Sequence, residues 1–203
     1  MHELAAVIVD TRRLSLYQVI TEHLFYLPKY TKLYIFSSED NRHLQEMLNC
    51  KFHVVEINDI RGYNKLLKSK NFWNKIKEEN ILIFQEDSRL LREGIEDFYE
   101  YDYVGAAWDF YPFVGNGGLS FRHKSAMLKV LEVCNPENDI NEDVYFAWGC
   151  NVLKLNLAPV HVANKFSCET QFNLGTLGYH AIEKYLPLEQ VNEIKKQYES
   201  IIN

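Results

Sequence analysis

The chain has 203 residues, enough for one large domain or two small ones, and 47% of them are apolar, which is ample for a core. Its formal net charge of −6 argues against a general nucleic-acid-binding protein, which normally carries a basic excess. No apolar stretch approaches the roughly 20 residues of a membrane-spanning helix, and the first residues lack the features of a signal peptide. We therefore expect a cytoplasmic protein without a membrane span.

The cysteines are far apart in the sequence and form no Cys-x-x-Cys pair, which disfavours a structural zinc site. Free thiols in a reducing compartment are the simplest interpretation. The four residues are Cys50, Cys134, Cys150 and Cys168.

The first hundred residues alternate between apolar strands and helical patterns. Strands are expected at residues 4–9, 32–36, 52–57 and 81–84, with helices at 16–24 and 41–48 and two short helices between 63 and 79. This alternation is typical of βαβ units around a largely parallel sheet and indicates a Rossmann-like half. No G-x-G-x-x-G motif follows the first strand, which counts against a dinucleotide-dependent enzyme.

The second half has a different pattern. Strands are expected at residues 103–107 and 119–122, helices at 124–133 and from residue 141 onward, an extended stretch at 158–168, and an amphipathic closing helix. An aromatic loop and the turn Gly115-Asn116-Gly117-Gly118 separate the two strands. No linker forces a division, so we expect one domain over residues 1–203.

The expected strand at residues 81–84 runs directly into Gln85, Glu86 and Asp87. Open α/β sheets bind ligands at the carboxyl ends of their strands, so these side chains would lie at the rim of a site. Carboxylate oxygens there suit a divalent cation that also holds substrate phosphates. The alternative is that they only cap a helix or face solvent.

Three further local features carry candidate functional residues. Three glycines within residues 115–118 exceed the need of a hairpin and would let backbone N–H groups approach a ligand closely. Asp143 has the chemistry of a general base, although residues 141–143 also suit the first turn of a helix. His180 fits a metal ligand or a phosphate contact, but also a structural histidine.

The order of these features resembles that of GT-A-type glycosyltransferases, in which a metal-binding D-x-D motif, a glycine loop, an x-E-D motif with the catalytic base and a C-terminal histidine follow one another. Over roughly residues 60–182 the amino-acid sequence is also similar to that of an uncharacterised family of GT-A-like domains. The segments that carry this similarity are Phe-Gln-Glu-Asp, Val-Gly-Ala-Ala-Trp, Val-Gly-Asn-Gly-Gly-Leu-Ser-Phe-Arg, Asn-Glu-Asp-Val-Tyr-Phe and Phe-Ser-Cys-Glu-Thr. The resemblance implies a GT-A, Rossmann-like α/β fold with a mixed, mainly parallel sheet flanked by helices. Residues 1–100 would be the nucleotide-binding half and residues 101–203 the acceptor and catalytic half.

The same resemblance implies a hexosyltransferase-like enzyme. It would move a sugar from a nucleotide-diphosphate donor, with UDP-sugars favoured, to a hydroxyl acceptor on a glycan. Asp87 and His180 would hold Mn²⁺ or Mg²⁺, but Gln85 stands where the first Asp of D-x-D is expected, and its neutral oxygen lowers the expected affinity. Asp143, beside Glu142 in the catalytic pair, would take the acceptor's proton and give inversion.

Other positions are assigned to the substrates by this resemblance. The donor contacts would be Asp10, Thr11 and Arg12 after the first strand, Gln85 and Glu86 after the fourth, and Asn116, Gly117 and Gly118 of the glycine turn. Arg12 or Arg13 would meet a phosphate. Trp108, Tyr111 and Phe113 would form a stacking wall for the acceptor, unless they pack beneath the glycine turn.

Two other functions stay open at this point. A metal-dependent phosphohydrolase would use Asp87, Glu142, Asp143 and His180, although the acidic chain disfavours a nucleic-acid substrate. A non-catalytic module that binds a nucleotide sugar or a glycan is the other, and Gln85 makes it conceivable. The sequence indicates no oligomeric state.

Overall fold

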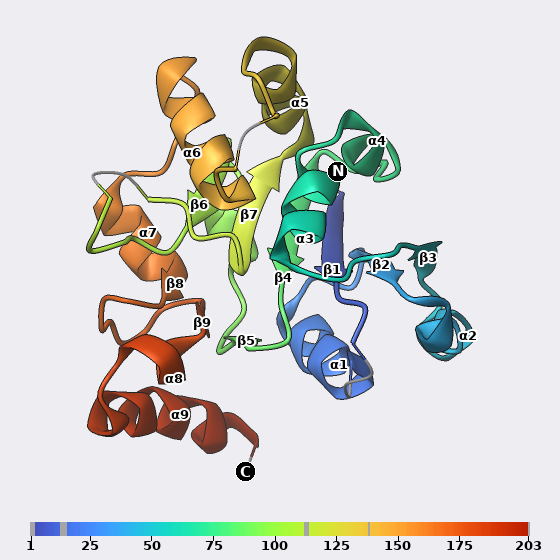
Figure 1. Cartoon of the computed structure of the whole chain (residues 1–203). Coiled ribbons are helices and arrows are strands. Elements are labelled where there is room, and N and C mark those ends of the chain that lie inside the picture. Colours follow the sequence, from blue (N-terminus) through green and yellow to red (C-terminus); the bar gives the residue numbers. More distant parts are fainter. Residues whose placement is uncertain (1–2, 13–15, 112–113, 138, 203) are drawn as a thin grey trace.

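The computed structural model of the chain describes residues 3–12, 16–111, 114–137 and 139–202. A six-stranded sheet forms its centre, in the order β3-β2-β1-β4-β7-β6, and β7 runs against the other five strands (Figure 1). The strands are β1 (Leu4–Val9), β2 (Lys32–Ser37), β3 (Lys51–Val54), β4 (Asn80–Phe84), β6 (Tyr103–Gly105) and β7 (Leu119–His123). The predicted α/β fold with a mixed, mainly parallel sheet is confirmed.

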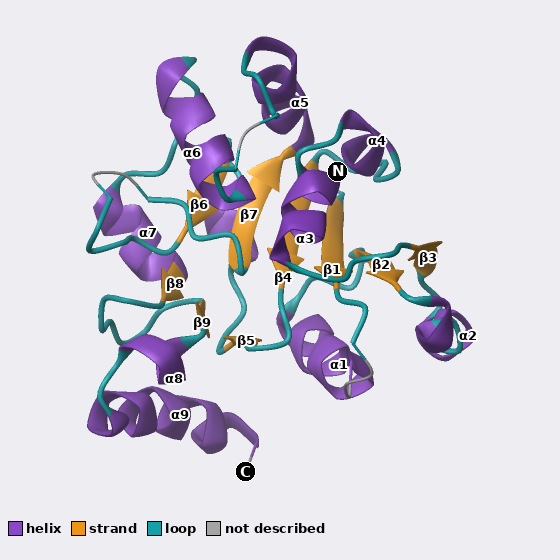
Figure 2. Ribbon diagram, viewed as in Figure 1, coloured by secondary structure: helices purple, strands orange, loops and turns teal. Residues whose placement is uncertain are grey.

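Helices cover both faces of this sheet (Figure 2). One face packs on α1 (Leu16–Tyr26), α2 (Leu44–Leu48) and α7 (Val160–Phe166), and the other on α3 (Ile60–Leu67), α4 (Lys70–Asn74), α5 (Lys124–Val133) and α6 (Glu142–Val152). The central strand β1 is buried on both sides, because alternate residues enter the two apolar clusters. The continuous apolar runs of the first half are therefore explained by helices on both faces.

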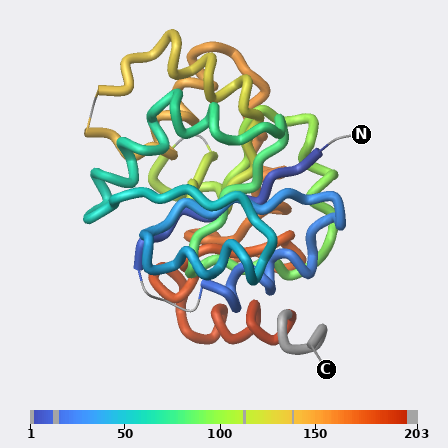
Figure 3. The backbone as a smooth tube through the Cα atoms, turned by 90° about the vertical axis from the view of Figure 1, so that its right-hand side faces the viewer, coloured from blue at the N-terminus to red at the C-terminus, as the bar shows by residue number. Residues whose placement is uncertain are grey.

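A small second sheet lies beyond the main one, with its strands in the order β5-β9-β8. Its strands are β5 (Ser88–Leu90), β8 (Ser167–Cys168) and β9 (Gly178–His180), and α8 (Ile182–Tyr185) and α9 (Leu188–Ile202) follow. The helix α9 runs along one edge of the molecule (Figure 3). Ser88 pairs with His180, and the Ala181 N–H donates to the Asp87 carbonyl at 3.1 Å. This pairing brings the C-terminal histidine to the acidic end of β4.

The remaining elements are two 3₁₀ helices, η1 (Glu39–Asn41) and η2 (Ile95–Phe98). In the part of the chain that the structure describes, no helix is both long and apolar enough to cross a membrane. The four cysteines are buried and free.

The prediction of an extended segment at residues 158–168 is wrong, because most of it forms α7. Its β-branched and aromatic residues favour extended backbone locally. Pro159 instead takes the N-cap position, and Ala163 and Phe166, three residues apart, are both buried, with the Phe166 ring 4.9 Å from that of Phe98. The strand predicted at residues 52–57 is also shorter than expected, since β3 ends at Val54.

Candidate active site

The glycine loop, residues 115–118, lies where the predicted motifs meet. The Gly118 carbonyl accepts a hydrogen bond from the Gln85 N–H at 2.8 Å, which fixes the loop to the end of β4. A Cβ atom on Gly118 would collide with the His180 imidazole, and one on Gly117 with the Glu142 carboxylate. Glycine is thus required for close approach on both sides of the loop. The structure brings together four segments that are separate in the sequence.

Glu142 begins α6 and is buried against Arg122 of β7. The guanidinium meets both carboxylate oxygens, with Nη1 2.5 Å from Oε2 and Nη2 3.0 Å from Oε1. The Arg122 guanidinium also lies 4.7 Å from the centre of the Tyr103 ring. Such a two-point ion pair holds the first turn of α6 in a fixed place. Both oxygens of Glu142 are occupied by this pair.

Asp143 is the neighbouring carboxylate and is half-buried beside the glycine loop. Its Oδ2 accepts a hydrogen bond from the Gly117 N–H at 3.3 Å, and its Oδ1 accepts one from the Val144 N–H at 2.8 Å. Burial, together with the negative charge of Glu142, raises the pKa of Asp143 to about 6, against the opposing effect of Arg122 and the two hydrogen bonds. A carboxylate with this pKa is ionised at neutral pH and is suited to accept a proton.

His180 lies between the end of β4 and a carboxylate that sequence reasoning did not assign. Its Nε2 lies 3.2 Å from both Gln85 Oε1 and Asp87 Oδ1, and its Nδ1 lies 3.0 Å from Glu169 Oε1. Burial lowers the pKa of His180, but hydrogen bonds and the charges of Asp87 and Glu169 outweigh this effect and raise it to about 9. Glu169 Oε1 also accepts a 2.6 Å hydrogen bond from Asn116, which ties the glycine loop to this group.

These donors fit a divalent cation, held jointly with a substrate, once His180 has lost the proton that its raised pKa keeps on the ring, because a metal binds the neutral imidazole. Adjacent ligands of an octahedral Mg²⁺ are about 3 Å apart, since each bond is about 2.1 Å. The 3.2 Å separations of Gln85 Oε1 and Asp87 Oδ1 from His180 Nε2 match that spacing. The carboxylate of Glu169 on the far nitrogen is the usual support of a metal-binding histidine. No group of three or more His, Cys, Asp or Glu side chains suited to a metal occurs among the described residues.

A pocket of about 310 Å³ lies at the carboxyl ends of β1 and β4. The predicted donor contacts Asp10, Thr11, Arg12 and Gln85 all line it. Arg12 Nη2 lies 2.6 Å from Asp10 Oδ2 and 3.0 Å from Glu86 Oε2, so this guanidinium links the ends of the two strands. The Thr11 hydroxyl is used inside the protein, where it donates to a backbone carbonyl at 2.9 Å.

Tyr63 of α3 also lines this donor-side pocket, and the sequence did not point to it. Its hydroxyl is buried and meets the Gln85 side chain, but it forms no hydrogen bond of good geometry within the described residues. A buried hydroxyl without a well-formed hydrogen bond is costly, so a ligand that satisfies it would bind with that advantage. Arg122 gave no signal either, because Leu119-Ser120-Phe121-Arg122 alternates apolar and polar residues, as in a strand with one solvent-facing side.

The predicted aromatic wall is divided between core and surface. Trp108 is buried and packs against Phe110 and Tyr111, with ring centres 6.0 Å and 5.3 Å apart. Phe110 and Tyr111 are 60% and 41% exposed. Packing therefore explains Trp108, while the two exposed rings are available to a ligand. The predicted contacts Arg13 and Phe113 lie outside the described residues.

Comparison with known proteins adds two findings to this geometry, and curated proteins give no match. The fold is similar to the crystal structure of the apo-form glycosyltransferase GlyE of Streptococcus pneumoniae TIGR4, with a TM-score of 0.54 and 12% sequence identity over 92% of this chain. The chain spans about half of that protein, 55% of its length, and at this identity the similarity concerns the fold alone. The family model described as "Protein of unknown function (DUF5672)" matches residues 44–187, and the chain belongs to this family.

Proposed function

We propose that the chain is a glycosyltransferase that moves a hexose from a nucleotide-diphosphate donor, preferably a UDP-sugar, to a hydroxyl of a glycan. The observation that carries this proposal is the position of the glycine loop. Gly117 lies against Glu142 and Asp143, and Gly118 lies against His180. A half-buried base and a histidine–carboxylate group thus flank one loop, which Gln85 joins to the donor-side pocket, in a fold similar to that of a glycosyltransferase.

In the proposed reaction, Asp143 accepts the proton of the acceptor hydroxyl. The freed oxygen attacks the anomeric carbon, and the bond from that carbon to the donor's diphosphate breaks, which releases the nucleoside diphosphate. Attack on the face opposite the leaving group inverts the anomeric carbon. A well-placed base contributes about 10²–10⁴-fold to such a rate. The buried pair of Glu142 with Arg122 assigns Glu142 to positioning Asp143 and to raising its pKa.

The donor would lie across the pocket at Asp10–Arg12 with its diphosphate towards Asp87 and His180. The Arg12 side chain is 65% exposed, and it would meet a phosphate by exchanging part of its ion pairing with Asp10 and Glu86. Gln85, Asp87 and His180 would hold Mn²⁺ or Mg²⁺, which supplies positive charge against the leaving diphosphate. Asn116 and the loop glycines would border the sugar.

The proposal is tested with the purified chain and a panel of nucleotide sugars. A donor that binds the folded state alone raises the melting temperature, and at 100 times its Kd it adds about 2.7 kcal/mol of stability. We expect a UDP-sugar to do so with Mn²⁺ present, and UDP to be released faster when acceptor glycans are added. Binding without UDP release would indicate the non-catalytic module. Release of inorganic phosphate would indicate the phosphohydrolase, and no response to any nucleotide sugar would refute the proposal.

A further inference from the structure

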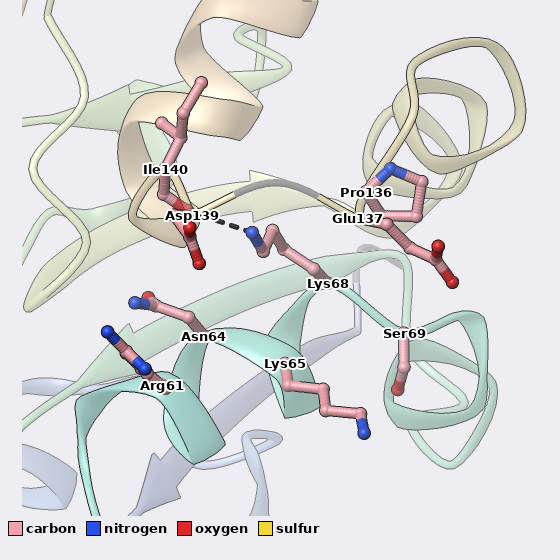
Figure 4. A pocket seen from close by; sticks show the side chains of 9 residues that line it. All are labelled: Arg61, Asn64, Lys65, Lys68, Ser69, Pro136, Glu137, Asp139 and Ile140. Atoms are coloured by element: carbon pink, nitrogen blue, oxygen red, sulfur yellow. Dashed lines mark hydrogen bonds between the residues drawn. The ribbon is translucent and has the colours of Figure 1, made fainter.

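A second pocket, of about 570 Å³, lies between α3 and the residues Pro136, Glu137, Asp139 and Ile140 (Figure 4). It uses a different face of α3 from the donor-side pocket. Ile60 and Tyr63 line the donor side, whereas Arg61, Asn64 and Lys65 line this one. Nothing in the proposed donor binding occupies it.

The charge of this pocket differs from that of the chain as a whole. Acidic residues outnumber basic ones by 28 to 22, yet residues 60–77 contain six Lys or Arg and no Asp or Glu. Arg61, Lys65 and Lys68 of this segment line the pocket. Arg61 and Lys65, one helical turn apart, are exposed and make no hydrogen bond or ion pair within the described chain.

Two carboxylates, Glu137 and Asp139, lie on the opposite wall. The charges of Asp139 and Glu142 both act on Lys68, which is buried. Three basic side chains thus line the pocket against two acidic ones. The pocket keeps a positive excess in a protein that is negative overall.

One wall of the pocket, at Asn64 and Ile140, is bonded to the segment that precedes the proposed base. Asn64 Nδ2 donates to Asn141 Oδ1 at 3.1 Å, and Asn64 Oδ1 accepts from the Glu142 N–H at 3.0 Å. Lys68 Nζ donates to the Ile140 carbonyl at 2.9 Å. These bonds join α3 to the residues that immediately precede Asp143. The pocket thus lies beside the segment that leads into Asp143, with the Asn64 side chain between them.

We propose that the pocket binds an anionic group of the acceptor, a carboxylate or a phosphate, so that the acceptor is an acidic or phosphorylated glycan. This inference rests on the proposed function, because it assigns the side of Asp143 away from the donor to the acceptor. The guanidinium of Arg61 has paired N–H donors that match the oxygens of a carboxylate or of a phosphate. Lys65 adds a second positive charge. The neighbouring carboxylates exclude a ligand of high negative charge and favour one or two anionic groups on a polar chain.

Binding is measured by calorimetry at low salt, without donor. The probes are hyaluronan tetrasaccharide, which carries uronic acids, and mannose 6-phosphate, with the neutral chitotetraose and mannose as counterparts. At least one acidic probe is expected to bind about tenfold more tightly than its neutral counterpart. The double substitution Arg61→Ala/Lys65→Ala is expected to remove that preference. Lys75→Ala/Lys77→Ala removes the same charge from the same segment outside the pocket and is expected to leave it unchanged.

Which probe responds tells a carboxylate from a phosphate. Equal binding of acidic and neutral probes, or an unchanged preference in the Arg61/Lys65 variant, would overturn the inference. UDP titrations of the same proteins separate the two proposals. If the Arg61/Lys65 variant loses its preference for the acidic probe but binds UDP with normal affinity, the anion-binding pocket is supported. If the native protein does not bind UDP, only the donor assignment is contradicted.

Discussion

Gly118 lies so close to His180 that the imidazole fills the space where a side chain at position 118 would be. Gly117 stands in the same relation to Glu142. The loop therefore acts as a spacer between the acid pair of α6 and the histidine of β9. A Cβ atom at position 117 or 118 must displace the group beside it.

Gly118→Ala is expected to reduce sugar transfer by at least tenfold and to lower the free energy of unfolding by about 1–3 kcal/mol, because the new methyl group displaces His180. Urea unfolding and UDP release measure the two effects. Gly62→Ala is the control, since its new methyl group would meet only ordinary contacts and helix α3 gains from alanine. Full activity in Gly118→Ala would show that the position of His180 does not matter.

Asp143→Asn is expected to lose transfer while keeping donor affinity, and at pH 7 to become more stable. Folding raises the pKa of Asp143 to about 6, so its ionised form opposes folding at neutral pH by up to about 3 kcal/mol. Asparagine removes that cost but loses part of the hydrogen bonding, which leaves a gain of about 1–2 kcal/mol. The gain should shrink as the pH falls from 6 towards 4, where the native carboxyl is protonated. A variant with native turnover would exclude Asp143 as the base.

The pH dependence of transfer should follow the same group. The base acts in its ionised form, so kcat/KM is expected to rise with pH to a plateau, with a midpoint near 6. Glu142→Gln removes the negative charge that raises the pKa of Asp143, so its midpoint is expected to lie lower. A midpoint that does not move would mean that another group controls the profile.

The strands β1, β2 and β4 could be predicted from the sequence, because they are apolar on both faces and are separated by helical patterns. β4 and the glycine loop were predicted from such local signals. The error at α7 has a tertiary cause. Val160 and Phe166 suit a strand locally, and only the packing of Ala163 and Phe166 beneath the sheet selects a helix.

The residues of the site also fall into two groups, those that local motifs predicted and those that only the fold brings together. Asp143, His180 and the loop glycines belong to local motifs and could be proposed from residue type and order. Glu169 could not, because its partners Asn116 and His180 are 53 and 11 residues away and are brought to it only by the small sheet and the loop. Contacts between distant segments have no signal in a single sequence.

The effects of Arg122 and Glu142 on the free energy of unfolding should be strongly coupled. Arg122→Met leaves a buried carboxylate without its partner and is expected to cost about 3–5 kcal/mol. The double variant Arg122→Met/Glu142→Gln is expected to cost less than the two single changes added together, by at least about 1 kcal/mol. Urea unfolding of the three variants measures this difference. If Arg122→Met does not fold while the double variant does, the coupling is equally evident, and additive costs would contradict it.

Calorimetry of UDP binding, with and without Mn²⁺, distinguishes the role of Glu169 from that of Asp87. Asp87→Ala removes a direct cation ligand in the proposed site and is expected to abolish the increase in UDP affinity that Mn²⁺ produces. Glu169→Gln leaves the ligands in place but weakens the support of His180, so the apparent Mn²⁺ affinity should fall about 10–100-fold with the increase preserved at saturating Mn²⁺. Glu132→Gln removes an exposed charge on α5 and should change neither value. If Asp87→Ala keeps the Mn²⁺-dependent increase in UDP affinity, the cation binds elsewhere. If Glu169→Gln keeps the native Mn²⁺ affinity, the role of Glu169 is limited to holding Asn116.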